Sequence, residues 1–581
     1  MRYTKSVKKN TIILFIILIF ASFLRFNNLS KVPVSLFGDE LDAGYQAYSI
    51  LKTGKDYSGN VMSIHLQSLA EWRTSLYLYS IVPTVALFGI SPLGVRLPAA
   101  IFGVLGVWAL YLLVKELIDR MDTKRLSYLP LIAAFLLTIS PWHLQYSRAA
   151  FEVTEMIFCL LMGLTFFFKS LRLKGKYLWV SGIFFMLMPW IYSTAKLFTP
   201  LFLFLLFVLY FKDIFRFPKK QILFAIVSML IVGVPILYST LFGGGSARFN
   251  YISVFGDPTL EPEIGTARGE DARARHEEGT GLTPTVVDKM FHNKVTYLGN
   301  EVIVHALTPF SSEFLFLTGD PNPRHSIDGM GEMYNIEIVA LLAGVAFFLF
   351  SKDRRIKLFI VGWIVLGVIP SALTTDGGNH ATRLILILPP LMILTSLGLL
   401  EMWLHTGKLF KPAYLGILFG AYLLAFSSYQ HLYWVHNQFQ SERWWHSGWS
   451  EAIAGVKEVE SQYDQVIITT RDEPPWIFFA AWSQYDPNLW HAGYPFEEHT
   501  IEGFGKMSYI NKYSFGSPQT LALYDWGKIL TPKMLFVASA KEVKVNLIKE
   551  PERTPGDLKL IKAIAYPSGE PVFYLFTKKE K

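Results

Sequence analysis

The sequence predicts a mainly α-helical membrane protein, a polytopic bundle of about eleven transmembrane helices followed by a small external α/β domain. Of its 581 residues, 52% are hydrophobic and 17% are charged, whereas soluble domains carry roughly 25% charged residues. The apolar residues gather in long runs, such as 197–211 and 384–400. Runs of this length cross a bilayer as helices.

Charge and cysteine content exclude several other classes. The net charge of +8 comes from short basic clusters between the apolar runs, which set membrane orientation and do not indicate nucleic-acid binding. The single cysteine, Cys159, lies in an apolar run. One cysteine excludes an internal disulfide framework and a cysteine-rich metal site, and we interpret Cys159 as a packing residue.

Eleven runs of about 15–20 residues are predicted to span the membrane. They start near Thr11, Leu97, Tyr128, Thr154, Tyr177, Leu197, Gln221, Tyr334, Leu358, Leu384 and Pro412. The first run follows a basic N-terminus but has no small-residue cleavage site, so we expect it to be retained rather than removed as a signal peptide.

The distribution of basic residues orients these spans. The loops assigned to the cytoplasm carry Lys115, Arg120, Lys124, Arg125, Lys169, Arg172, Lys174, Lys176, Lys212, Arg216, Lys219, Lys220, Lys352, Arg354, Arg355, Lys357, Lys408 and Lys411. The short outer loops carry only Arg148, Lys196 and Arg383. This asymmetry predicts a cytoplasmic N-terminus and an external C-terminal domain in the plasma membrane. It also requires that Ser75–Gly89 does not span, so we expect an interfacial helix there.

Three long segments then face outward, at 27–96, 242–334 and 429–581. We expect a membrane domain over 1–428 and an external domain over 429–581. In the external domain, 446–461 predicts an amphipathic helix, and 464–470, 533–540 and 570–577 predict strands. Within 242–334, we expect the charge-mixed stretch 267–281 to be mobile and 286–307 to form an amphipathic helix.

Ionisable residues gather at the outer ends of the spans, whereas the central turns have almost none. The acidic pair Asp39 and Glu40 follows the first span. The basic candidates are Arg148, Lys196, Arg324, His325, His380 and Arg383. Because these residues share one depth on one face, we expect a cleft that holds an anion at the membrane interface.

Each of these residues also has a purely structural interpretation. Asp39 could cap the following helix, and Arg148, Lys196 and Arg383 could mark span ends. No His-x-x-His spacing occurs, which argues against a dedicated zinc site, although Asp39 and Glu40 with water could hold a divalent cation. The cluster 443–449 is more typical of an aromatic membrane anchor than of sugar stacking.

Over residues 10–430 the chain resembles the polyprenyl-phosphate-sugar-dependent glycosyltransferases of the GT-C fold, which include protein O-mannosyltransferases and lipid A aminoarabinose transferases. The similar segments are the Asp-Glu pair with LKTGKDYSGN and LFGISPLGVRLPAA after it, then TISPWHLQYSRAAFE, and finally NHATRLILILPPL. Two departures concern sugar and lipid choice. The chain reads EWRTS at 71–75 where some relatives have Lys-Pro-Pro, and Lys196 stands where relatives often have arginine.

The resemblance implies a hexosyl or pentosyl transferase that uses a polyprenyl-phosphate sugar. An acceptor on a protein, lipid or glycan would attack the anomeric carbon at the outer face in one inverting displacement. Asp39 would be the general base, Glu40 would orient the acceptor, and the basic candidates would stabilise the leaving phosphate. The alternatives are a transporter or flippase of lipid-linked sugars, which would need midplane charges that the spans lack, and a receptor or assembly protein that acts through the tail.

Overall fold

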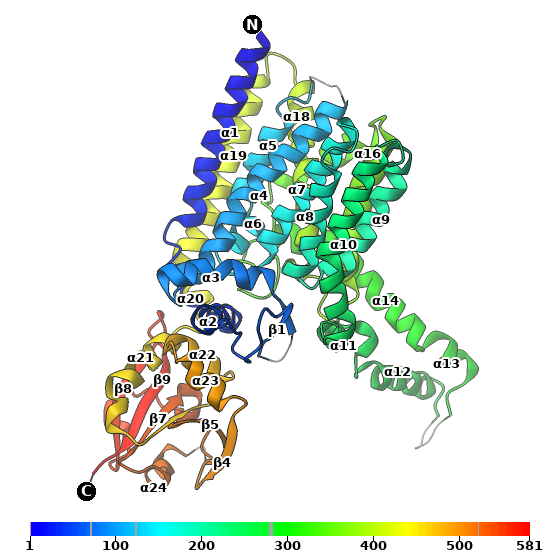
Figure 1. The fold of residues 1–581 in the computed structure, drawn as a ribbon. Coiled ribbons are helices and arrows are strands. Elements are labelled where there is room, and N and C mark those ends of the chain that lie inside the picture. The colour runs from blue at the N-terminus through cyan, green and yellow to red at the C-terminus, as the bar shows by residue number, and fades with distance from the viewer. Residues whose placement is uncertain (1, 70–71, 122–124, 278–282, 521, 581) are drawn as a thin grey trace.

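The computed structural model describes residues 2–69, 72–121, 125–277, 283–520 and 522–580. Its larger part is a bundle of helices that run side by side (Figure 1). The helices at the eleven predicted spans are α1 (Arg2–Phe26), α4 (Pro92–Met121), α5 (Leu129–Ile139), α7 (Val153–Arg172), α8 (Leu178–Ile191), α9 (Ala195–Ile214), α10 (Lys219–Phe242), α15 (Glu337–Leu349), α16 (Arg354–Ala372), α18 (Leu388–His405) and α19 (Lys411–His431).

Within the described residues, eight helices are long and apolar enough to cross a membrane. The helices α5, α8 and α15 are shorter, with 11, 14 and 13 residues. The chain leaves α5 at Ser140, whose backbone turns out of the helical region (ψ 124°) before Pro141 starts the short helix α6 (Pro141–Ser147). Proline cannot continue the preceding helix and favours the first position of a new one.

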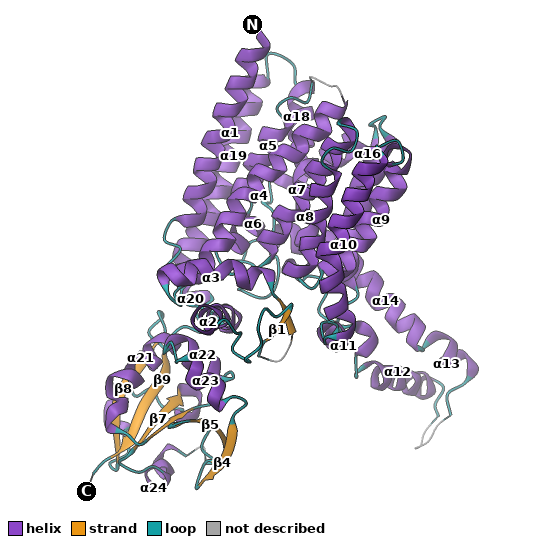
Figure 2. Cartoon of the chain, in the orientation of Figure 1, coloured by secondary structure: helices purple, strands orange, loops and turns teal. Residues whose placement is uncertain are grey.

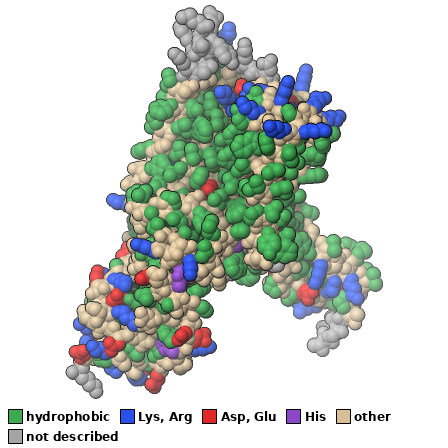
Figure 3. Space-filling view, in the orientation of Figure 1, with side chains coloured by type: hydrophobic (Ala, Val, Ile, Leu, Met, Phe, Trp, Pro, Cys, Tyr) green, Lys and Arg blue, Asp and Glu red, His purple; other side chains and the backbone are tan. Residues whose placement is uncertain are grey.

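The surface of the bundle is apolar where lipid would contact it. Hydrophobic side chains cover its flank in Figure 3, and Lys and Arg gather at the end where the N-terminus lies. On α10, Leu223, Ile231 and Leu237 have exposed fractions of 58%, 69% and 57%. Such a continuous apolar surface is stable only in a bilayer, so the chain is a multi-pass membrane protein.

The segment 27–96 builds a layer at one end of the bundle (Figure 1). It contains α2 (Gly38–Thr53), the antiparallel strands β1 (His65–Gln67) and β2 (Trp72–Thr74), and α3 (Leu76–Phe88). Figure 1 shows α3 lying across the end of the bundle, as expected of an interfacial helix. Helix α2 lies next to α3, outside the bundle (Figure 1).

The second outer segment is helical. It holds α11 (Ala247–Ile252), α12 (Leu260–Ala274), α13 (Val286–Phe291) and α14 (Lys294–Leu307). The predicted helix 286–307 is broken at Asn293, whose side chain accepts hydrogen bonds from the amides of Val295 and Thr296 and so starts α14 anew. The stretch predicted to be mobile is helical in α12 as far as Ala274, and 278–282 lie outside the described residues.

The tail is a sheet-containing domain (Figure 2). Its seven strands lie in the order β4-β5-β6-β3-β7-β9-β8, with β3 parallel to β6 and β7 and the other pairs antiparallel. They are β3 (Gln465–Ile468), β4 (Glu497–Ile501), β5 (Gly505–Ile510), β6 (Tyr513–Phe515), β7 (Met534–Ser539), β8 (Leu558–Ala565) and β9 (Pro571–Lys578). The helices α21 (Trp449–Val459), α22 (Pro475–Trp482) and α23 (Pro487–Gly493) accompany the sheet. Helix α21 and strands β3, β7 and β9 match the predicted elements.

Helix α2 joins the bundle to the tail. It lies between them in Figure 1 and packs against α3 on one side and α22 on the other. The Tyr45 hydroxyl donates to the carbonyl of Tyr485 at 3.0 Å, and the Tyr45 ring packs edge-on against Trp490. His491 Nε2 lies 2.8 Å from the carbonyl oxygen of Asp56. The tail is therefore anchored on the helix that carries the acidic pair.

The predicted orientation can be tested with single-cysteine variants. Lys352→Cys lies between α15 and α16, and Ser461→Cys lies in the tail. Because the native Cys159 is buried, it gives little background with a membrane-impermeant maleimide. We expect labelling of Ser461→Cys from the outside of intact cells, and of Lys352→Cys only after the cells are opened. Labelling of both variants from the same side would contradict the orientation.

Candidate active site

Asp39 lies in the first turn of α2, with its side chain exposed. The N-cap position belongs to Phe37 and has no side-chain cap hydrogen bond, so Asp39 does not cap the helix. Its backbone carbonyl accepts from Arg73 Nη1 at 3.1 Å. Among the described residues, no hydrogen bond to the Asp39 carboxylate is found. This carboxylate is therefore held in place by its backbone, while its oxygens remain available to a substrate.

Glu40, its neighbour, is in the opposite situation. It is fully buried, and Arg96 donates to both of its oxygens, from Nε at 2.8 Å and from Nη2 at 2.7 Å. The amide of Ala150 donates to Oε1 at 2.8 Å. Arg96 itself is fully buried and also donates to the carbonyls of Pro33 and Ser35. Glu40 therefore fixes α2 to α4 and to two loops, and it presents no oxygen to a substrate.

A second ion-pair group holds α2 from another side. Arg73 Nη1 lies 3.4 Å from Asp42 Oδ2, and Arg73 Nη2 lies 3.6 Å from Glu152 Oε2. These two ion pairs join β2 to α2 and to the start of α7. Burial raises the pKa of Asp42 to about 6, although the Arg73 charge and a hydrogen bond from Ser68 lower it. These contacts restrain the first two turns of α2, which include Asp39.

Arg148 is a structural clamp in this fold. It is buried, and its guanidinium donates to the carbonyls of Leu24, Arg25, Asn27 and Val32 and to the Tyr433 hydroxyl, at 2.7–3.3 Å. These bonds use Nε and both terminal nitrogens. Arg148 therefore closes the end of α1 against α19, and its donors are engaged by the protein.

Lys196 and Arg383 lie in two further places. Lys196 Nζ donates a hydrogen bond to the carbonyl of Gly245 at 2.9 Å. Burial, together with the nearby charge of Lys196, lowers the pKa of the His65 imidazole to about 4. Arg383 is buried and donates to Thr374 Oγ1 at 2.7 Å and to Asp376. Both side chains face outer loops, at different elements of the bundle.

Arg324, His325 and His380 are connected through aromatic contacts with Phe37, the residue that precedes α2. The Arg324 guanidinium lies over the ring of Phe37, 4.9 Å from the ring centroid. Phe37 is two residues before Asp39 in the sequence. The rings of His325 and His380 are 4.9 Å apart. His325 also packs on Phe151, and Phe151 packs on Phe37. One continuous aromatic layer thus connects the histidines with the start of α2.

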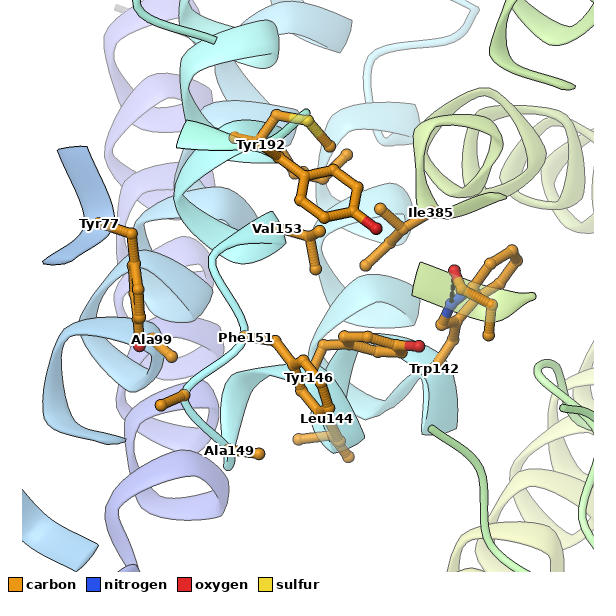
Figure 4. Close-up of a cluster of buried hydrophobic side chains, with 14 of the residues drawn as sticks. Tyr77, Ala99, Trp142, Leu144, Tyr146, Ala149, Phe151, Val153, Tyr192 and Ile385 are labelled. Carbon is orange, nitrogen blue, oxygen red and sulfur yellow. Dashed lines mark hydrogen bonds between the residues drawn. The ribbon is translucent and has the colours of Figure 1, made fainter. Parts of the chain in front are cut away.

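Figure 4 shows part of this layer. Tyr146 from α6 and Phe151 lie side by side, with ring centroids 4.8 Å apart, and Tyr192 from the end of α8 lies on the other side of Val153. The Tyr146 hydroxyl is 2.7 Å from Thr382 Oγ1, next to Arg383. The layer gives the basic residues an apolar floor, which strengthens their attraction for an anion.

A buried carboxylate supports the histidines. Asp320 Oδ2 lies 2.9 Å from His325 Nδ1 and accepts from the amide of Ala381 at 2.8 Å. Burial raises the pKa of Asp320, but the hydrogen bond and charge of His325 outweigh it and hold the pKa below its usual value. Burial, with the Asp320 charge, raises the pKa of the neighbouring Glu332 well above its usual value.

Asp320, His325 and His380 are also the group that could hold a metal ion among the described residues. From the sequence, Asp39 and Glu40 with water were the residues that could hold a divalent cation. Both Glu40 oxygens are bound by Arg96, so that pair does not offer two free carboxylates. The expectation that no dedicated zinc site exists rested on local spacing, and it missed a group assembled from positions 55–60 residues apart.

The tail contributes to the same region. Glu473 follows β3 and lies 3.5 Å from His446 Nε2. A hydrogen bond with His446 is the main cause that lowers the pKa of Glu473, and the charges of Arg324 and Asp39 act on it in opposite directions. These four groups are thus within electrostatic reach of one another. From the sequence, His446 was considered as part of the aromatic cluster 443–449 and Glu473 was not singled out, because the contact between tail and bundle appears only in the folded chain.

A polar cavity of about 350 Å³ continues from this point into the tail. It is lined by residues that follow the parallel strands β3 and β7, including Asp472, Glu473 and Lys541, and by Arg443 and Tyr566. Ligands commonly bind outside the carboxyl ends of parallel strands. Another crevice, of about 340 Å³, lies at the opposite end of the bundle, and apolar side chains predominate in its lining.

The chain is similar to a known protein family over part of its length and to several solved structures. Residues 74–238 match a family model described as dolichyl-phosphate-mannose-protein mannosyltransferase. The chain is similar to GT-C glycosyltransferases. The matched region runs from β2 through α10 and includes Arg96, Arg148 and Lys196. A search of the curated proteins found no match.

Two solved structures illustrate the similarity. ArnT from Cupriavidus metallidurans, bound to undecaprenyl phosphate, is 10% identical over 97% of both chains, with a TM-score of 0.49. The oligosaccharyltransferase of Archaeoglobus fulgidus, tethered with an acceptor peptide, is 14% identical over 81% of this chain, with a TM-score of 0.48. This chain covers 62% of the length of that archaeal enzyme.

The buried pair predicts a large stability effect at Arg96. Arg96→Met leaves Glu40 as an unpaired buried charge, and we expect the variant to lose about 3–5 kcal/mol of stability. The control is Arg172→Met, which breaks a pair with Glu116 at a half-exposed position and should cost less than about 1 kcal/mol. Thermal unfolding monitored by size-exclusion fluorescence checks both. Equal stability of the two variants would contradict the structural role of Arg96.

Proposed function

We propose that the chain is a membrane glycosyltransferase that moves a sugar from a polyprenyl-phosphate donor to an acceptor at the outer face of the plasma membrane. The observation that carries this proposal is the exposed Asp39 carboxylate two residues after Phe37, because the Arg324 guanidinium lies over the Phe37 ring and Phe151 links that ring to His325. A carboxylate that can accept a proton then lies next to a basic group that can hold a phosphate. The apolar layer beneath them faces the bundle, from which a lipid tail would enter.

The chemistry is one inverting displacement. An acceptor oxygen or nitrogen attacks the anomeric carbon while the bond from that carbon to the phosphate oxygen breaks. The bonding electrons leave with the polyprenyl phosphate, and the proton of the acceptor passes to Asp39. A positioned carboxylate typically contributes about 10²–10⁴-fold to such a step. Glu40 acts indirectly, because its pair with Arg96 fixes the helix turn that carries Asp39.

The leaving phosphate gains negative charge as the bond breaks. Arg324, His325 and His380 are placed to stabilise that charge, because they border the same aromatic layer. Arg383 lies close to this group, because it and His380 both face Asp376. The donor in this proposal is a sugar on a polyprenyl monophosphate, in line with the lipid phosphate named for ArnT and the family named by the matched model.

The acceptor enters from the tail in this proposal. The polar cavity that Glu473 lines offers carboxylates, cations and the Tyr566 ring. Such a lining suits a hydroxyl-bearing or amine-bearing group on a protein, lipid or glycan. The residues around Asp39 would determine whether the transferred sugar is a hexose or a pentose.

The base assignment predicts that Asp39→Asn abolishes transfer while the protein still folds. The amide keeps the shape of the side chain but cannot accept the proton, and Asp39 makes no cap bond that the substitution could break. Product formation by purified protein in nanodiscs, with a polyprenyl-phosphate sugar and a panel of acceptors, is the measurement. The control is Asp486→Asn on the tail surface, which we expect to be as active as wild type. Near-normal turnover by Asp39→Asn would reject the base role.

The phosphate assignment predicts that Arg324→Gln lowers turnover about a hundredfold, equivalent to about 3 kcal/mol, with a smaller loss of donor binding. Only interactions that strengthen in the transition state accelerate the reaction. The inner-face variant Arg216→Gln should leave both quantities unchanged. Equal loss of binding and turnover would indicate simple docking of the headgroup. Movement of the sugar lipid between leaflets without any product would instead favour the flippase alternative.

A further inference from the structure

The crevice of about 340 Å³ at the end of the bundle opposite the candidate active site has apolar walls from five helices. They include Leu117 of α4, Leu129 of α5, Phe347 of α15, Ile360 of α16 and Leu397 of α18. Phe350, which also lines it, is 85% exposed, so the crevice is open to the surroundings of the bundle. Its volume is within the range of about 300–1,000 Å³ that is usual for sites of small ligands.

Three polar side chains line the same crevice, at helix ends beside the basic loops. Arg125 Nη2 donates a hydrogen bond to Glu401 Oε2, and His405 Nδ1 lies 3.6 Å from that oxygen. The His405 ring stacks on Phe347, with ring centroids 5.1 Å apart. The Arg125 side chain is 54% exposed, and its other guanidinium nitrogens have no hydrogen-bond partner among the described residues. Arg125 therefore offers cationic donors beside an apolar crevice.

This combination fits an amphiphile with a hydrocarbon chain and a phosphate. The apolar walls disfavour a ligand that is polar throughout, because its hydrogen bonds to water would not be replaced. A guanidinium with free donors binds phosphate well, often through two parallel hydrogen bonds. The adjoining loops also carry the exposed Lys352, Arg354 and Lys408. Basic pockets between membrane helices on the cytoplasmic side bind the headgroups of anionic lipids in this way.

We propose that this crevice binds one anionic phospholipid, with an acyl chain between the apolar walls and its phosphate on Arg125. The lipid comes from the leaflet at the basic end of the bundle, which the charge distribution predicts to be the cytoplasmic one. Its chain contacts α4 and α5 on one side and α15, α16 and α18 on the other, so the bound lipid stabilises the folded bundle. This binding is independent of the proposed glycosyl transfer.

The test uses full-length protein that has been freed of lipid in detergent. Dioleoyl phosphatidylglycerol or dioleoyl phosphatidylcholine is added, and bound lipid is counted by native mass spectrometry. We expect wild type to bind one phosphatidylglycerol at least about tenfold more tightly than phosphatidylcholine, and Arg125→Gln to lose this preference. Leu397→Trp, which fills the crevice and keeps the ion pair, should weaken the binding of both lipids.

The matched control is Arg172→Gln. Arg172 lies at the same end of the bundle and pairs with Glu116, and its side chain is 47% exposed, but it does not line the crevice. This variant should bind phosphatidylglycerol as wild type does. Equal affinity of wild type, Arg125→Gln and Leu397→Trp for phosphatidylglycerol, or an equal loss in Arg172→Gln, would overturn the proposal.

Thermal unfolding gives a second readout that needs no activity. A ligand that binds only the folded state raises the unfolding temperature, so phosphatidylglycerol should stabilise wild type and Arg172→Gln more than Arg125→Gln or Leu397→Trp. The same stabilisation by inorganic phosphate alone would contradict a bound acyl chain. Tighter binding of a polyprenyl phosphate that is lost in Arg125→Gln would assign the crevice to that lipid and overturn the proposal. Because no sugar donor is present, loss of the phospholipid site leaves the transferase proposal standing, and an inactive wild type leaves the phospholipid site standing.

Discussion

The fully buried ion pair between Glu40 and Arg96 is the constraint on which the site depends. Burying two charges is costly, and the cost is offset only when every remaining donor and acceptor is satisfied. Here Arg96 also binds the carbonyls of Pro33 and Ser35, and Glu40 also accepts from the amide of Ala150. One interaction therefore fixes α2, α4 and two loops at once. Asp39, one residue away, is exposed because its neighbour anchors the helix.

The same helix explains how the membrane bundle and the tail act together. Its outer side packs on α22, and its first residues meet Trp445 and Arg324. Glu473 of the tail is within electrostatic reach of Asp39. Chemistry placed at this junction has lipid on one side and water on the other. That position suits a reaction between a membrane-anchored donor and an acceptor outside the membrane.

Much of the fold follows from the sequence, because long apolar runs and the basic loops report span positions directly. The interfacial helix at 76–88 followed from the same charge argument. Strands such as β4, with its exposed EEHTI sequence, carry no burial pattern and were missed. The site was harder to predict. In the sequence, Arg148 and Arg324 both stand at the end of a span. Only the fold shows that the guanidinium of Arg148 donates its hydrogen bonds to backbone carbonyls within the protein. Likewise, Asp320 and Arg96 gain their importance from partners more than 50 residues away.

A cryo-electron microscopy structure of the Asp39→Asn variant with a bound polyprenyl-phosphate sugar would show whether the donor phosphate and residue 39 meet at the junction of bundle and tail. We expect the phosphate to contact Arg324 and His325 or His380, with the anomeric carbon facing residue 39 and the lipid leaving along the bundle. A donor headgroup bound instead at the opposite end of the bundle, beside Arg125 and Glu401, would contradict this expectation.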